Sequence, residues 1–307
     1  MANITVSASN VTVSQINKGV PAKAALSMTP CFFFLYINVV MLITLRSKAI
    51  FRDTSRYILF TNMLFADSLN LVYCMLMYIF AIIRLYMRSI VCALVMLAGA
   101  VIALISPLSL AMMALERYIA ICFPLRHAEI TMCRRTGVAI AIVWALGSVQ
   151  AFTNLILLLI SGPLVSTLDF CSGLSMPGME AYTDVNNAFT IIYFLSVGLT
   201  IVYTYIGIVV AARSASSDKC SAAKAHRTVL LHLIQLGLCL SSILFDSIIA
   251  LVRAHLDLFA ALNVQYVMFL GLIIFPRCLS PLIYGLRDQT FRPLFLYYFS
   301  FGFCASN

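Results

Sequence analysis

Long apolar stretches separated by short polar connections make up most of this chain. A helix needs about 20 mostly apolar residues to cross the roughly 30 Å hydrocarbon core of a lipid bilayer, and seven stretches have that character. The pattern predicts an all-α membrane protein, a seven-transmembrane helix bundle over residues 25–285. The predicted spans are Ala25–Leu45, Tyr57–Ile83, Ser89–Ile119, Thr136–Ile160, Val185–Ala212, Val229–Val252 and Leu262–Gly285.

The last segment, residues 286–307, carries a shorter apolar pattern. Apolar side chains recur there at i, i+3, i+4 and i+7, the spacing of one helix face, with Arg287 and Arg292 nearby. This favours a short amphipathic C-terminal helix lying on the inner membrane surface, and Pro293 restricts where that helix can begin. The apolar face consists of Phe291, Leu294, Phe295 and Tyr298.

The composition agrees with a bilayer-embedded protein. Apolar residues make up 63% of the chain and charged residues 10%, with a mean hydropathy of +1.02, whereas a soluble domain has about 25% charged residues. So few charges cannot cover a soluble globule, which excludes a soluble enzyme, a disordered tail and a coiled coil. The net charge of +9 does not indicate a nucleic-acid partner, because in a membrane protein the positions of the positive charges matter more than their sum.

Most positive charges lie in the connections on one side of the predicted bundle. The first, third and fifth connections and the C-terminal segment hold fourteen of the 20 Lys and Arg residues. The positive-inside rule then places the N-terminus outside and the C-terminus in the cytoplasm of a plasma-membrane protein. Two N-glycosylation sequons, at Asn3 and Asn10, agree with this orientation. We therefore expect residues 1–24 to form a glycosylated extracellular tail and residues 286–307 a cytoplasmic tail.

Two of the ten cysteines lie on the predicted outer side. Cys92 begins the third span, and Cys171 is the only cysteine in the long connection between the fourth and fifth spans. The outer face is oxidising, so these two can form a disulfide that ties the connection over the bundle. The sequence has no CxxC, HExxH or Cys/His cluster and no nucleophile–base motif. We therefore expect no metal, no cofactor and no catalytic residues.

Two segments carry a resemblance to a known family. The run Met113–His127, MALERYIAICFPLRH, closely resembles the signature of odorant receptors, a branch of the rhodopsin-like (class A) G-protein-coupled receptors. The run Ser280–Asp288, SPLIYGLRD, resembles the Asn-Pro-x-x-Tyr ending of that family's seventh span. Further residues that stand where the superfamily keeps them are Asn38, Leu64, Asp67, Trp144 and the Cys92–Cys171 pair.

The resemblance implies a set of residues that couple the receptor to a heterotrimeric G protein. Glu116 is expected to restrain Arg117 at rest and to release it on activation; the alternative is an interfacial pair without such a role. The chain departs from the family pattern because Glu116 replaces the commoner Asp, Ser280 replaces Asn, and the sixth span has no tryptophan. The fifth span also has no proline. The coupling set is Glu116, Arg117, Tyr118, Ser280, Pro281 and Tyr284.

Helical spacing from Arg117 defines an inward face of the third span. The small residues Gly99, Ala103 and Ser106 on that face leave space for a ligand in the outer and middle bundle, although small residues also serve close helix packing. Aminergic receptors carry an Asp at the position of Gly99, so its absence argues against an amine hormone. We expect a small-molecule odorant in this region instead.

Asp246 lies in the predicted sixth span, roughly 25 Å from the cytoplasmic side. One interpretation is that it lines the ligand pocket and favours ligands with a hydrogen-bond donor or a positive charge. An equally good interpretation is a carboxylate in a wet outer vestibule that contacts no ligand. The predicted ligand-binding set is Met96, Gly99, Ala103, Tyr193, Phe245, Asp246 and Ile249.

Asp67 and Arg277 are expected to form an ion pair inside the bundle. Asp67 lies roughly 15 Å from the cytoplasmic side in the second span and Arg277 roughly 12 Å in the seventh, and the resemblance places these two helices side by side. Relatives use the acid at this position to hold a sodium ion, and here Arg277 is predicted to supply the counter-charge. With Asn38 and Ser106 the pair forms a predicted buried polar switch.

The sequence therefore predicts an odorant-type G-protein-coupled receptor, with an odorant, a G protein and membrane lipid as partners and with no prediction about dimers. One alternative is a class A receptor for another small ligand. A transporter that uses Asp67, Asp246 and Arg277 is a further alternative, and the odd number of spans and the missing internal repeat argue against it.

Overall fold

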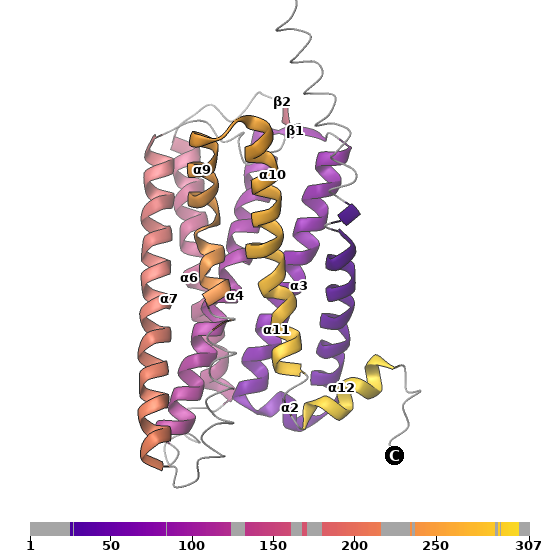
Figure 1. Ribbon diagram of the computed structural model, residues 1–307, viewed down its shortest axis with the longest axis vertical. Coiled ribbons are helices and arrows are strands. Elements are labelled where there is room, and N and C mark those ends of the chain that lie inside the picture. Colours follow the sequence, from indigo (N-terminus) through magenta and orange to yellow (C-terminus); the bar gives the residue numbers. More distant parts are fainter. Residues whose placement is uncertain are drawn as a thin grey trace, which may run out of the picture.

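A computed structural model gives the architecture of the chain. It describes residues 25–26, 28–83, 85–123, 133–160, 168–170, 180–215, 234, 237–285, 288 and 290–300. Within these ranges almost every residue lies in a helix, and the long helices run side by side as a bundle (Figure 1). Six of them are long and apolar enough to cross a membrane, or seven if a bent pair counts as one span.

The predicted seven-transmembrane bundle is confirmed, and its helices extend beyond the predicted spans. Hydropathy marks only the part of a helix that crosses the hydrocarbon, whereas the helical hydrogen bonds continue into the polar zone. The first five helices are the unlabelled span Met28–Ser47, α3 (Ser55–Ile82), α4 (Ser89–Cys122), α6 (Cys133–Ile160) and α7 (Glu180–Ala215). The rest of the bundle consists of Gly237–Ile243, α9 (Phe245–His255), α10 (Leu258–Met268), η1 (Phe269–Ile274) and α11 (Phe275–Gly285).

A small antiparallel sheet caps one end of the bundle. Strand β1 (Tyr86–Arg88) pairs with β2 (Leu168–Phe170), with Tyr86 opposite Phe170 and Arg88 opposite Leu168. The sheet attaches the connection after α6 to the turn before α4 (Figure 1). The sequence analysis did not predict it, because three-residue strands are too short to show an alternating pattern. We call this end of the molecule the sheet end.

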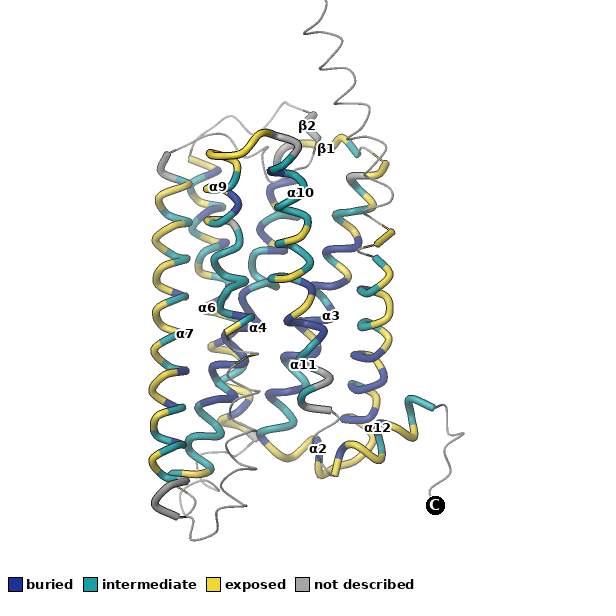
Figure 2. Tube along the Cα trace, viewed as in Figure 1, coloured by how far each residue is buried: buried dark blue, intermediate teal, exposed yellow. Residues whose placement is uncertain are grey.

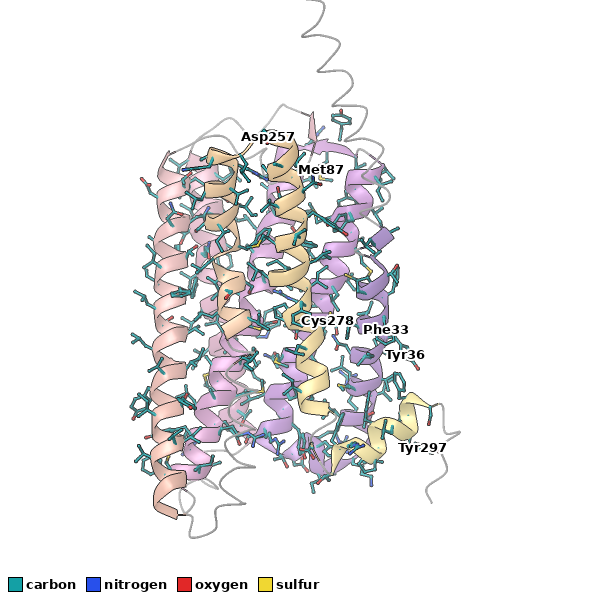
Figure 3. The ribbon with its side chains drawn as sticks, viewed as in Figure 1. Phe33, Tyr36, Met87, Asp257, Cys278 and Tyr297 are labelled. Carbon is teal, nitrogen blue, oxygen red and sulfur yellow. The ribbon has the colours of Figure 1, made fainter. Side chains whose placement is uncertain are left out.

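The opposite end carries two short helices, α2 (Ala49–Asp53) and α12 (Phe291–Phe299). The predicted C-terminal helix is therefore present: Phe291 and Phe295 are buried, and Pro293 lies in the first turn, where a missing N–H removes no intrahelical hydrogen bond. The Tyr36 hydroxyl of the first span donates to the carbonyl of Phe299 at 3.4 Å. Figure 3 shows Tyr36 beside this helix. We call this end the α12 end.

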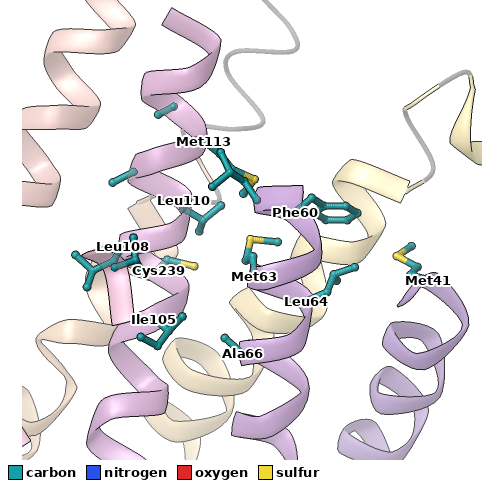
Figure 4. Close-up of a cluster of buried hydrophobic side chains, with 14 of the residues drawn as sticks. Met41, Phe60, Met63, Leu64, Ala66, Ile105, Leu108, Leu110, Met113 and Cys239 are labelled. Carbon is teal, nitrogen blue, oxygen red and sulfur yellow. The ribbon is translucent and has the colours of Figure 1, made fainter. Parts of the chain in front are cut away.

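The largest apolar core lies between the first span, α3 and α4. Met41, Met63, Leu64, Ile105 and Leu110 are all fully buried there, and Figure 4 shows their side chains converging from the three helices. The outward faces of α6 and α7 show the reverse pattern, with many large apolar side chains exposed (Figure 2). Such faces are expected where lipid rather than water surrounds a protein.

The sixth span bends although it contains no proline. The axes of Gly237–Ile243 and Ser247–His255 differ by 62°. Directly before the break, the Ser241 hydroxyl donates to the Gly237 carbonyl at 2.9 Å and the Ser242 hydroxyl donates to the Cys239 carbonyl at 2.6 Å. Serine hydroxyls that bond to carbonyls of the preceding turn commonly bend helices. We attribute the bend to this pair of serines.

Candidate functional site

An irregular seventh span places Arg277 inside the bundle. The π-helical turn Phe269–Ile274 widens the helix, and Pro276 follows without an N–H to donate. Carbonyls of this stretch therefore lose regular helical partners. Arg277 Nη1 donates to the Ile273 carbonyl, and Nη2 donates to the Ala103 carbonyl of α4 at 3.5 Å. The guanidinium thus bonds to one carbonyl of its own span and to one of α4, and it joins the seventh span to the third.

Asp67 of α3 is the charge that faces Arg277. Arg277 Nε lies 3.9 Å from Asp67 Oδ1, and the two side chains are 2% and 1% exposed. The Ser106 hydroxyl of α4 donates to the same carboxylate oxygen. Opposite charges buried this deeply attract strongly, but they have also lost their hydration, so the pair needs good geometry to offset that loss. The expected contact between Asp67 and Arg277 is present, and it connects three helices.

Several buried polar atoms, of this pair and of Asn38 in the first span, have no hydrogen-bond partner among the described residues. They are Asp67 Oδ2, Arg277 Nε and both polar atoms of the Asn38 side chain. At 3.9 Å, the Nε–Oδ1 contact is an ion pair but too long for a hydrogen bond. Unpaired polar atoms in a buried site are costly. A small displacement of α11 relative to α3 would therefore change the energy of the site substantially.

The α12 end of α4 holds Glu116 and Arg117. Arg117 Nε lies 3.9 Å from Glu116 Oε2, and the arginine side chain is 34% exposed. The Ser55 hydroxyl at the start of α3 donates to Glu116 Oε1 at 3.3 Å. The carboxylate is therefore held between its neighbour and the second span. The sequence analysis missed Ser55, which no spacing rule connects to a residue on another helix.

Tyr118 reaches across to α7. Its hydroxyl lies 3.3 Å from that of Tyr203, and the ring centroids are 5.4 Å apart. The Tyr118 ring lies over Gly207, where a Cβ would come within 2.3 Å of the ring. The position thus requires glycine for this contact. The Cys122 thiol donates to the Gly207 carbonyl at 3.6 Å, so α4 and α7 are tied together near this end.

The structure changes the interpretation of Gly99 in the predicted ligand region. A Cβ there would come within 2.2 Å of the Tyr73 ring of α3, so the expected space is occupied by an aromatic side chain. The Tyr73 hydroxyl donates to the sulfur of Met96 at 3.5 Å. Gly99 therefore serves close packing of α3 on α4, and Tyr73 is a residue of this region that the sequence analysis missed.

Three other predicted ligand-binding residues lie on α7 and α9. Tyr193 is buried, and its hydroxyl donates to the Leu146 carbonyl of α6 at 2.6 Å. Phe245 packs edge to face on Phe269, with ring centroids 6.3 Å apart. Ile249 is 4% exposed. Tyr193 and Phe245 thus have defined partners in the bundle.

Several predicted residues fall outside the described part of the chain. These are Asn3, Asn10 and Cys171, together with the side chains of Asp246, Ser280, Pro281 and Tyr284. Cys92 is disulfide-bonded. Strand β2 ends directly before Cys171, and β1 ends shortly before Cys92. Among the described residues no group of three or more His, Cys, Asp or Glu side chains is arranged to hold a metal ion.

A second polar cluster, which the sequence analysis also missed, attaches α12 to the start of α3. Asp288 Oδ2 lies 2.8 Å from Arg56 Nη2 and accepts from the Tyr57 hydroxyl at 3.0 Å. Asp288 Oδ1 accepts from the backbone N–H groups of Thr290 and Phe291 at 3.0 and 3.1 Å. One carboxylate therefore caps α12 and binds it to the start of α3.

The fold and these contacts define a polytopic membrane protein with a charge pair inside its helix bundle and a second, more exposed pair at one end. A family model described as "7 transmembrane receptor (rhodopsin family)" matches residues 37–284. The chain belongs to this family of receptors, and among them to the odorant receptors. It is thus a signalling receptor and not an enzyme.

Two relatives support the odorant-receptor assignment. The chain is similar to "Odorant receptor 131-2" of Danio rerio, at 35% identity over 274 residues, which cover 88% of this chain and 83% of that protein. It is also similar to "Olfactory receptor 2A1/2A42" of Homo sapiens, at 32% identity over 190 residues, which cover 59% of each chain. The prediction of an odorant-type receptor is confirmed, and the transporter alternative is not favoured.

Proposed function

We propose that the chain is a plasma-membrane receptor with its sheet end outside and its α12 end in the cytoplasm. Fourteen of the 20 basic residues lie in the connections and tail of the α12 end, which supports this orientation. Residues 1–24 are then an extracellular tail glycosylated at Asn3 and Asn10, and residues 286–307 a cytoplasmic tail. Cys171 is the proposed disulfide partner of Cys92.

The receptor binds a small-molecule odorant in the half of the bundle nearer the sheet end. Met96, Ala103, Tyr193, Phe245 and Ile249 all lie on helices α4, α7 and α9 around this part of the interior. Gly99 contributes indirectly, because it seats the ring of Tyr73 beside Met96. Asp246 belongs to the same proposed set. The name of the zebrafish relative, which matches 88% of this chain, supports an odorant as ligand.

The Glu116–Arg117 pair carries the proposal of G-protein coupling. Glu116 is held by Ser55, and Arg117 is one third exposed at the α12 end, where it can leave the carboxylate and contact a protein in the cytoplasm. Tyr118, Ser280, Pro281 and Tyr284 complete the proposed coupling set. A ligand that binds one arrangement of the helices better than the other shifts the equilibrium between them.

The Asp67–Arg277 pair links the two ends. It lies between α3 and α11 and also touches α4 through Ser106 and Ala103, so a shift of the seventh span alters its contacts. Arg277 supplies the positive charge that a sodium ion supplies in relatives. Asn38, whose two side-chain polar atoms have no hydrogen-bond partner in the described part of the chain, is the fourth member of this proposed switch.

An assay in transfected cells tests the function. Cells that express the receptor with a surface tag are exposed to a panel of volatile and water-soluble compounds, and cAMP is measured. We expect an agonist-dependent rise that Arg117→Ala abolishes at equal surface expression. Arg134→Ala is the matched control, because Arg134 is an exposed arginine in the first turn of α6, at the same end of the bundle. Substrate flux without a G-protein response would contradict the proposal.

A further inference from the structure

Three amide side chains meet between α6 and α7. Asn154 Nδ2 donates to Asn186 Oδ1 at 2.9 Å, and Gln150 Nε2 donates to the same oxygen at 3.0 Å. We call Gln150, Asn154 and Asn186 the amide cluster. Amide groups are uncommon on membrane-spanning faces because an unpaired polar group in hydrocarbon is expensive. Three of them at one point therefore need a specific explanation.

The amide cluster lies in the half of the bundle nearer the sheet end. Asn154 stands six residues before the end of α6 and Asn186 six residues after the start of α7, so each is about 9 Å from its helix end. The Tyr193–Leu146 hydrogen bond lies further from the sheet end on the same two helices. The amide cluster therefore lies nearer the sheet end than Tyr193, a predicted ligand-binding residue on the same helix as Asn186.

Asn154 faces the interior of the bundle. The buried residues of α6 recur at helical spacing, and Gly147, whose Cβ would come within 2.9 Å of Ile105 of α4, marks the face of α6 that packs on α4. Ala151, Asn154 and Leu158 continue that face, at 9%, 3% and 4% exposure. The amide of Asn154 thus has apolar residues one turn before and one turn after it.

The carbonyl oxygen of Asn154 is buried without a hydrogen-bond partner among the described residues. Rotating the Asn154 amide alone does not relieve this, because its oxygen would then face Asn186 Oδ1, which accepts from Gln150. Asn154 Nδ2 and Gln150 Nε2 both donate to one acceptor, Asn186 Oδ1. The cluster consequently presents to the interior an acceptor, Asn154 Oδ1, that has no partner among the described residues.

We propose that Asn154 Oδ1 binds the hydroxyl hydrogen of the ligand, so that the receptor selects small apolar molecules that carry a neutral hydrogen-bond donor, namely aliphatic or cyclic alcohols. A neutral donor fits because an amide oxygen does not compensate a full positive charge away from water. Gln150 and Asn186 are positioning residues that hold the Asn154 amide with its oxygen inward. This inference rests on the proposed function and assigns it a ligand class.

A purely structural role makes a different prediction. Amides that only join two transmembrane helices contribute to stability, and their removal lowers stability without changing which ligand is preferred. A bound water on Asn154 Oδ1 would likewise leave alcohols and ethers equivalent. Ligand preference, rather than activity or expression alone, therefore separates these possibilities.

The test compares each alcohol with its methyl ether and its parent hydrocarbon. Ligand-induced stabilisation of the purified receptor in nanodiscs measures binding, and cAMP in cells measures activation. The parent receptor is expected to prefer the alcohols by about tenfold, the effect of one neutral hydrogen bond away from water. Asn154→Leu, which has a similar size and no acceptor, should lose this preference. Asn154→Thr should lose it too, because the threonine oxygen lies closer to the backbone than Asn154 Oδ1. Thr153→Ala is the control, because that hydroxyl bonds to Val149 of its own helix.

The two readouts separate the inference from the function on which it rests. Alcohols that bind and activate the parent, with the preference lost in Asn154→Leu or Asn154→Thr, support the inference. Equal potency of alcohols and ethers, or an alcohol preference that survives both substitutions, overturns it while leaving an active receptor. Alcohol binding without any cAMP response supports the site and contradicts coupling. No binding and no response to any compound contradicts both.

Discussion

Individual side chains set how closely the helices approach. Tyr73 occupies the volume that a side chain at Gly99 would need, and Tyr118 does the same at Gly207. In both places an aromatic ring of one helix packs on the bare backbone of another. Small residues in membrane bundles commonly permit such close approach. At Gly99 the consequence is that the ring of Tyr73, and not empty space, borders Met96.

Replacing Gly99 should therefore destabilise the receptor. Gly99→Ala forces the Tyr73 ring aside, and overpacking of this kind costs about 1–3 kcal/mol. We expect a lower unfolding temperature of the purified receptor and partial recovery when Tyr73→Leu is added. Gly137→Ala is the control, because nothing lies within 4 Å of a Cβ at that position. A Gly99→Ala receptor as stable as the Gly137→Ala one would show that Tyr73 is not confined as described.

The Asp67–Arg277 pair makes the second prediction at this scale. Asp67→Asn and Arg277→Gln should each destabilise the receptor by about 3–5 kcal/mol, because each leaves an uncompensated buried charge. The double variant should cost clearly less than the two single changes together, since both charges are then absent. Unfolding temperatures of the four proteins measure this coupling. Additive effects, as for distant sites, would contradict the pairing.

At the scale of elements, α12 depends on a single carboxylate. Asp288 caps the helix and pairs with Arg56, while Phe291 packs edge to face on Phe51 with centroids 5.7 Å apart. The tail helix is thereby fixed to the first turn of α3 and to α2.

Removing that carboxylate should loosen α12 selectively. Asp288→Ala loses the cap and the ion pair, a change of about 0.5–2 kcal/mol for the cap alone, so backbone amides of Phe291–Phe299 should exchange hydrogen faster. Asp288→Asn keeps a capping oxygen and should lie between the parent and Asp288→Ala. Hydrogen exchange in the interior of α4 is the internal reference and should not change. If the α12 amides exchange hydrogen at the same rate in all three proteins, the stability of α12 comes from the packing of Phe291 and Phe295 and not from Asp288.

Regular helices were predictable, and irregular ones were not. The depths of Asp67 and Arg277 followed from a constant rise per residue, and the family resemblance that sets the second and seventh spans side by side then placed the two charges together. The same rule contains no signal for the π-helical turn Phe269–Ile274 or for the bend after Ser242. Hydropathy and helical spacing assume a regular helix, so neither irregularity is visible to them.

Contacts between residues on different helices were also not predictable. Asp288 was treated as part of a motif ending, and Asn154 and Asn186 were treated as ordinary members of apolar spans. Their roles emerge only when α12 is set against α3 and α6 against α7, which hydropathy and helical spacing do not determine. Glu116 and Arg117, by contrast, were recognisable because the motif that contains them is contiguous in sequence.

At the scale of the whole molecule, we propose that the Arg277 guanidinium takes the place of a bound cation beside Asp67, between the proposed ligand and G-protein ends. Replacing sodium chloride by choline chloride should therefore leave agonist potency unchanged in the parent receptor. Arg277→Gln leaves the Asp67 carboxylate without its partner, so this variant should become sodium-sensitive. Agonist concentration–response curves in both salts measure the effect, with Arg253→Gln, an exposed arginine that bonds to Gln265, as the control. Sodium sensitivity of the parent would contradict the replacement.

Agonist-stimulated nucleotide exchange on a purified heterotrimeric G protein, with the receptor reconstituted in nanodiscs, tests the central claim most directly. The account predicts that an agonist accelerates exchange by the parent receptor, and that Arg117→Ala still binds the agonist but does not accelerate exchange. Full exchange activity of Arg117→Ala, or agonist binding by the parent that never accelerates exchange, would contradict it.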